Sequence, residues 1–140
     1  MMLSILSAFI STIGFAIVFH TQKKHLLVCG GIGAIGWAIY LLGESRGFSV
    51  LLSTFLATLL VSELSYLLAK KLKTPITIFL IAGIIPLVPG LPLYRTMYSL
   101  MLSDYTVSLT YAILTFEIAG SIAGAIVIIS LFPLLWKKRI

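Results

Sequence analysis

Long apolar stretches, separated by short polar links, constrain this chain more than any other feature of its sequence. Of its 140 residues 60% are hydrophobic and 10% are charged, and the mean hydropathy is +1.16. So little polar surface cannot coat a water-soluble globule, whereas apolar runs of about 20 residues match the thickness of a bilayer. We therefore predict an all-α polytopic membrane protein, a single domain over residues 1–140 with five transmembrane segments. These segments cover residues 2–19, 26–42, 48–69, 75–104 and 107–135.

The fourth segment contains a cluster of prolines. Its 30 residues exceed one straight span, and residues 86–92 read PLVPGLP. Each proline removes a backbone donor and clashes with the preceding turn, so a continuous helix is excluded there. The sequence predicts half-helices over Ile76–Ile85 and Leu93–Ser103, with an irregular break at residues 86–92 between them.

The distribution of Lys and Arg predicts the orientation. The links after the first and third segments and the C-terminal tail carry two, three and three such residues, whereas the link after the second carries one and the link after the fourth none. Because basic residues concentrate in cytoplasmic links, this pattern places the N-terminus outside the cell membrane and the C-terminus in the cytoplasm. The same residues form no extended basic groove, so we expect no nucleic-acid partner.

Small residues recur at helical spacing in three of the segments, and such stripes let helices approach closely in lipid. We expect these faces to pack against other helices or against a partner chain. They are also compatible with a higher oligomer. The stripes are Ser4, Ser7, Ser11 and Gly14, then Gly30, Gly33 and Gly36, and finally Gly120, Ser121 and Gly124.

The break is the strongest functional signal, because irregular backbone inside a membrane is tolerated only where it is buried in protein or lines a cavity. Secondary transporters use such half-helices to bind anionic substrates. We predict that Arg95 and the amides near it bind a carboxylate, with tyrosine hydroxyls as partners. The alternative is that Arg95 pairs permanently with an internal carboxylate or reaches a head group. The predicted substrate site comprises Pro86, Pro89, Gly90, Pro92, Tyr94, Arg95 and Tyr98.

Two carboxylates inside predicted spans are candidates for proton coupling. Glu63 lies about two turns from the cytoplasmic end of the third segment, and Glu117 lies within the fifth, on the face of Gly120 and Gly124. Intramembrane carboxylates need a partner or a proton and often act as relays. Glu117 is also the best candidate ion partner for Arg95, whereas Glu63 could reach the lysines at the end of its own segment.

Enzyme chemistry has no recognisable basis in this sequence. His20 and His25 do not share one helix at metal-binding spacing, and the single cysteine, Cys29, cannot form a metal cluster. No P-loop, nucleophile elbow or HExxH motif is present. We expect no enzyme activity, no metal and no cofactor.

The stretch from Thr74 to Gly90, continuing to Tyr94 and Arg95, resembles the signature of the threonine/serine exporter family. The core of that signature, G-x-x-P-L-V-P-G, is matched at residues 83–90. The chain is similar in particular to the family's small integral-membrane subunit. Where some relatives have another proline, this chain has Ala82.

The resemblance implies proton-driven export of threonine and serine, or of dicarboxylates such as succinate in some relatives. It also implies a larger multispan partner subunit, since the family occurs as one fused chain or as two chains. A non-transporting scaffold or regulatory subunit is the alternative, and an enzyme acting on lipid is a weaker one.

Overall fold

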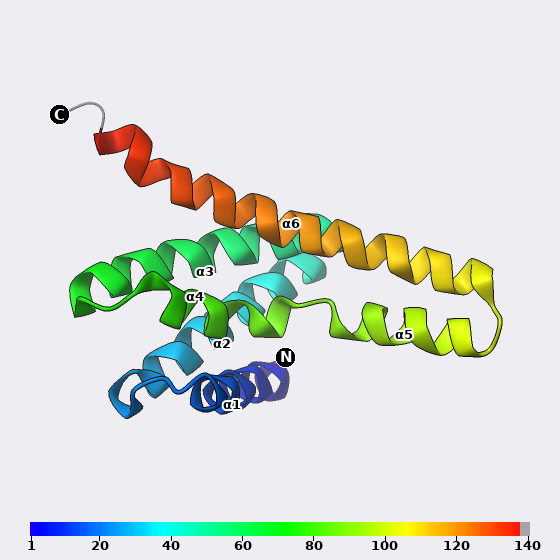
Figure 1. Ribbon diagram of the computed structural model, residues 1–140, viewed down its shortest axis with the longest axis horizontal. Coiled ribbons are helices and arrows are strands. Elements are labelled where there is room, and N and C mark those ends of the chain that lie inside the picture. The colour runs from blue at the N-terminus through cyan, green and yellow to red at the C-terminus, as the bar shows by residue number, and fades with distance from the viewer. Residues whose placement is uncertain (138–140) are drawn as a thin grey trace.

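The computed structural model describes residues 1–137, and every regular element in that range is helical. Figure 1 follows the chain from α1 to α6. The elements are α1 (Met2–Val18), η1 (Lys23–His25), α2 (Leu26–Ser45), α3 (Val50–Leu72), α4 (Ile76–Ile84), η2 (Ile85–Leu87), α5 (Gly90–Met101) and α6 (Tyr105–Lys137). The predicted all-α class is confirmed for the described residues.

The membrane spans are confirmed only in part. Among the described residues, Lys23–Ser45, Val50–Leu72 and Tyr105–Leu131 are long and apolar enough to cross a bilayer. The pair α4 and α5 makes a fourth if its two halves form one bent span. Since α1 has only 17 residues, about 25 Å at 1.5 Å per residue, it falls short of the usual span length. The count of five spans therefore stays a prediction.

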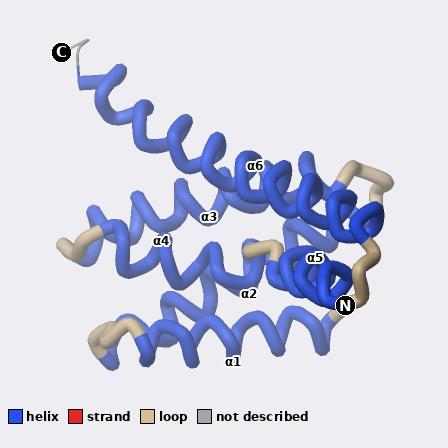
Figure 2. The backbone as a smooth tube through the Cα atoms, turned by 45° about the vertical axis from the view of Figure 1, so that its right-hand side comes forward, coloured by secondary structure: helices blue, strands red, loops and turns tan. Residues whose placement is uncertain are grey.

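The helices form a stack in which α1 and α6 lie at opposite edges, with α2, α3 and α4 between them (Figures 1 and 2). The helix α4 lies against both α2 and α3, and its Phe79 is fully buried. This position explains why so short a helix is stable, because most of its stabilisation comes from packing rather than from its own hydrogen bonds.

Glycines allow the central helices to approach closely. A Cβ at Gly83 of α4 would lie 2.7 Å from Ile32 Cγ2 and 2.9 Å from Val61 Cγ1. A Cβ at Gly33 of α2 would collide with the side chain of Thr12 on α1. The predicted packing role of the glycine stripe in the second segment is therefore confirmed.

The serine stripe of α1 does not pack against the helices of this chain. Ser4, Ser7 and Ser11 are exposed, and nothing lies within 4 Å of a Cβ built at Gly14. Instead α1 buries Ala8, Thr12 and Ala16, which are spaced four residues apart on a neighbouring face. Both sets fit a helical period, so the choice between them is made by tertiary packing.

The helix α5 packs against α6, and the two project beyond the other helices (Figure 1). Ser108 of α6 donates a hydrogen bond to the carbonyl of Thr96 on α5 at 2.9 Å. Asp104 accepts a hydrogen bond from the N–H of Val107 at 3.2 Å, which caps the start of α6. Further along, Ser121 donates to the carbonyl of Leu51 at 2.9 Å and so ties α6 to α3.

The lysine-bearing links after α1 and α3 lie at the same end of the stack. His25 Nε2 lies 3.4 Å from the hydroxyl of Thr74, and the imidazole meets the ring of Phe79 edge-on at 5.4 Å. The link between α2 and α3 lies at the other end, where Ser53 of α3 packs against Gly43 of α2. This alternation agrees with the crossing directions that the basic residues predict.

Candidate functional site

The proline cluster forms a short, bent connection. The 3₁₀ turn η2 contains Pro86, and Val88 follows in an extended conformation with φ −60° and ψ 133°. The helical axis bends by 53° between the two sides of this connection. The N–H of Val88 donates to the carbonyl of Ile85 at 3.1 Å, and that of Gly90 donates to the carbonyl of Val88 at 2.7 Å. The predicted interruption of the fourth segment is therefore present.

The interruption is shorter than the sequence predicts. The helix α5 begins at Gly90 rather than at Leu93, so Pro92 is its third residue. Because the first four N–H groups of a helix have no partner within it, a proline there removes no hydrogen bond. Arg95 consequently lies in the second turn of α5, where the helix dipole opposes a positive charge less strongly.

A cavity of about 290 Å³ lies directly against the break. Most of its lining is apolar, with the indole of Trp37 and the hydroxyls of Tyr40 and Thr54 as the polar side chains. Trp37 and Tyr40 stack with their ring centroids 5.0 Å apart. The cavity is lined by Trp37, Tyr40, Val50, Thr54, Pro86, Leu87, Val88, Pro89, Gly90, Leu91, Pro92, Leu114 and Ile118.

A second cavity, of about 400 Å³, shares two lining residues, Trp37 and Pro86, with the first. It is lined by Ser4, Ser7, Ala8, Ser11, Trp37 and Pro86. The hydroxyl of Ser7 donates to the carbonyl of Leu3 at 2.9 Å, and that of Ser11 to the carbonyl of Ala8 at 3.1 Å. Trp37 and Pro86 therefore form the wall that the two cavities share, and the serine stripe of α1 lines a hollow instead of a helix contact.

The predicted substrate residues separate into two groups. Pro86, Pro89, Gly90 and Pro92 line the cavity at the break, whereas Tyr94, Arg95 and Tyr98 do not. Those three are exposed on α5, where Tyr94 and Tyr98 stack with ring centroids 5.9 Å apart. The structure therefore does not gather the predicted residues into one pocket.

Arg95 contacts a tyrosine of α6. Its Nη1 donates to the hydroxyl of Tyr111 at 2.6 Å, and its guanidinium lies 5.3 Å from the centroid of that ring. Tyr111 precedes Leu114, a lining residue of the cavity, by one helical turn. Arg95 thus lies one turn beyond the cavity, and Tyr111, its partner among residues 1–137, is neutral.

The structure does not pair Arg95 with Glu117. Tyr111 lies six residues before Glu117, which corresponds to about 9 Å along α6 at 1.5 Å per residue. Glu117 is exposed, and the described hydrogen bond from this part of α6 to α3 is made by Ser121. Glu63 is also exposed, although Ser62 and Ser65 beside it are buried. Both carboxylates lie on helix faces that this chain leaves uncovered.

Sequence reasoning did not find Trp37, Tyr40 or Tyr111. The first two share a helix with the glycine stripe, and aromatic residues at i and i+3 beside such a stripe were the available signal. The contact of Tyr111 depends on how α5 and α6 are rotated, which sequence spacing does not specify. Among residues 1–137, no group of three His, Cys, Asp or Glu side chains is placed to bind a metal ion.

A family comparison decides which class of protein has this geometry. The family described as Threonine/Serine exporter, ThrE, matches residues 4–132. The chain belongs to this family. The match covers the proline cluster and both cavities, so the features described here lie within the region typical of the exporter. No solved structure matches the chain.

Membership identifies the chain as a membrane component of a threonine/serine exporter, which is a transporter and not an enzyme family. The resemblance carried by residues 83–90 is thereby confirmed. The apolar helices agree with that assignment, because an exporter must pass its substrate through the bilayer.

Proposed function

We propose that this chain is the small subunit of a proton-driven exporter of threonine and serine, or of dicarboxylates such as succinate. It acts with a larger multispan subunit in the cell membrane, with five spans, its N-terminus outside and its C-terminus in the cytoplasm. The observation that carries the proposal is the cavity against the break. Its volume of about 290 Å³ suits a small solute, since ligand pockets begin near 300 Å³.

The substrate carboxylate binds near Arg95 in this proposal. A guanidinium has five N–H donors, and the one described contact to Tyr111 leaves most of them for an anion. The hydroxyls of Tyr94 and Tyr98 lie on the same helix and provide further donors. The substrate therefore extends from the cavity at the break toward α5, over the single turn that separates Leu114 from Tyr111.

A second subunit accounts for the charged residues that this chain leaves uncovered. Glu63 is the fourteenth residue of α3, about 13 Å from its end at Leu72 at 1.5 Å per residue. A glutamate side chain is too short to reach the interface from there, so the carboxylate requires a polar partner, water or a proton. Glu117 is in the same situation on α6. Each is a candidate to carry the coupling proton.

Transport by the reconstituted pair tests this proposal. Proteoliposomes that contain both subunits should export labelled threonine, serine or succinate when a proton gradient is imposed. Glu63→Gln and Glu117→Gln mimic the protonated carboxyl, so the variant at the relay should keep substrate exchange and lose its response to the gradient. Asp104→Asn is the matched control, because Asp104 caps a helix end and should leave the response unchanged.

Deletion of the gene in cells gives an independent test. Intracellular threonine, serine or succinate should rise if the chain exports them. Unchanged pools, together with altered assembly of another membrane complex, would contradict export and favour the scaffold function.

A further inference from the structure

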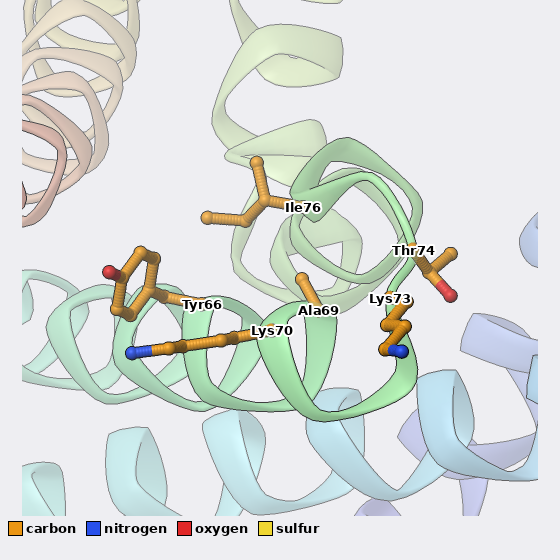
Figure 3. Close-up of a pocket in the computed structure, with 6 residues that line it drawn as sticks. All are labelled: Tyr66, Ala69, Lys70, Lys73, Thr74 and Ile76. Carbon is orange, nitrogen blue, oxygen red and sulfur yellow. The ribbon is translucent and has the colours of Figure 1, made fainter.

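A third cavity, of about 460 Å³ and widely open at the protein surface, lies at the lysine-bearing end of the stack, where α3 ends and α4 begins. Figure 3 shows its lining, which consists of Tyr66, Ala69, Lys70, Lys73, Thr74 and Ile76. The break lies at the opposite end of α4. The nine residues of α4 separate the two cavities by about 13 Å at 1.5 Å per residue, so this cavity is not part of the proposed substrate site.

The polar part of this cavity suits an anion with several oxygens. Lys70 and Lys73 supply two ammonium groups, and Tyr66 and Thr74 supply hydroxyls. The side chain of Lys70 extends toward Tyr66, whereas Lys73 lies at the other end beside Thr74 (Figure 3). The acidic residue of α3, Glu63, precedes Lys70 by seven residues and does not line the cavity.

The remaining part of the cavity is apolar. Ala69 lies between the two lysines, and Ile76 points into the space opposite Tyr66 (Figure 3). Leu67 and Leu72 of the same helix are exposed, at 51% and 39%. An anion that carries hydrocarbon therefore fits better than a free ion, since its chains can follow this apolar surface.

The position along the membrane normal leads to the same ligand. Lysines at the end of a spanning helix lie at the level of lipid head groups, and basic pockets between helix ends bind anionic phospholipids. We propose that this cavity binds the head group of an anionic phospholipid, with Lys70 and Tyr66 contacting it at one end of the cavity and Lys73 at the other. The proposal does not depend on what the protein exports.

Native mass spectrometry of the full chain in an uncharged detergent tests the site, with phosphatidylglycerol and phosphatidylcholine as probes. The chain should retain phosphatidylglycerol in preference to phosphatidylcholine. Charge-assisted contacts from the lysines to the phosphate account for this preference. The Lys70→Gln, Lys73→Gln variant should therefore lose it and bind phosphatidylglycerol no better than phosphatidylcholine.

The Lys23→Gln, Lys24→Gln variant is the matched control, because it loses the same charge at the same end of the stack without changing the cavity lining. Its affinity should fall far less than that of the Lys70 and Lys73 variant. Equal losses in the two variants would overturn the site and indicate general attraction to the basic end. Displacement of the lipid by millimolar inorganic phosphate would also overturn it and indicate a free-phosphate site.

Tyr66→Phe separates binding from folding, since it removes one hydroxyl without changing the charge. It should weaken phosphatidylglycerol binding severalfold while the thermal unfolding temperature in detergent stays unchanged. Unchanged lipid affinity in this variant would remove Tyr66 from the site and contradict the proposed ligand set.

Discussion

Arg95 allows two interpretations that a double-mutant cycle can separate. If Arg95 is paired permanently with Glu117, those two residues are energetically coupled. If Arg95 instead keeps its contact with Tyr111, the coupling is between Arg95 and Tyr111. The 2.6 Å hydrogen bond to Tyr111 involves a charged donor, and such bonds contribute about 1.5–3 kcal/mol. Because Arg95 is exposed on α5, we expect the lower part of that range.

One cycle combines Arg95→Gln with Tyr111→Phe, and a second combines Arg95→Gln with Glu117→Gln. Tyr111→Phe removes the hydroxyl and keeps the ring, so the contact between guanidinium and ring, about 0.5–1 kcal/mol at exposed sites, stays in part. We expect a coupling free energy of about 1.5 kcal/mol for Arg95 with Tyr111. Glu117 lies about 9 Å along α6 from Tyr111, the residue that Arg95 contacts, so the effects of Arg95→Gln and Glu117→Gln should be additive within about 0.5 kcal/mol.

The free energies of unfolding of the unmodified chain, the three single variants and the two double variants, measured by denaturant titration in detergent, provide both values. Threonine export by the same variants adds the functional comparison. Arg95→Lys keeps the charge and loses the planar geometry, so it should weaken substrate binding more than folding. A coupling above about 1 kcal/mol between Arg95 and Glu117, or full transport by their double variant, would refute the assignment of Arg95 to the substrate.

Three further predictions follow from packing, cavities and charge. Gly83→Ala should lower the unfolding free energy by about 1–3 kcal/mol, because its Cβ would meet Ile32 and Val61 at 2.7 and 2.9 Å. Gly120→Ala is the control and should leave the unfolding free energy unchanged, because nothing lies within 4 Å of a Cβ built there. Trp37→Ala should join the cavities of about 290 and 400 Å³ and raise the ratio of leucine to threonine efflux, whereas Trp37→Tyr should not. Lys71→Cys in a Cys29→Ala background should react with impermeant thiol reagents only from the cytoplasmic side, and labelling of intact cells from outside would contradict the orientation.

The helices and the break could be predicted from the sequence because they follow from local rules. Apolar runs and proline chemistry act over a few residues, and they located α3 and the interruption after Ile84. The early start of α5 was missed, although the tolerance of a helix for proline in its first turn, here Pro92, could have indicated it. The cavity and the partner of Arg95 could not be predicted, because they depend on the rotation of helices against one another. Tyr111, for example, is sixteen residues away from Arg95.

Charged side chains exposed on the helices of this chain indicate that it needs other protein or water around it. A charged side chain at the centre of a spanning helix costs roughly 2.5–3.5 kcal/mol, and Arg95, Glu63 and Glu117 are all exposed on helices of this stack. Together their cost is comparable to the 5–15 kcal/mol by which whole domains are stable. Arg95 has a neutral partner in Tyr111, whereas Glu63 and Glu117 lie on faces left open by the packing of α3 and α6. We infer that these two faces are covered by protein or by water in the working exporter, because an ionised carboxylate that meets lipid alone is strongly destabilising. The proposed coupling role of these glutamates requires the same cover, since a carboxylate exchanges protons only with groups or water that reach it.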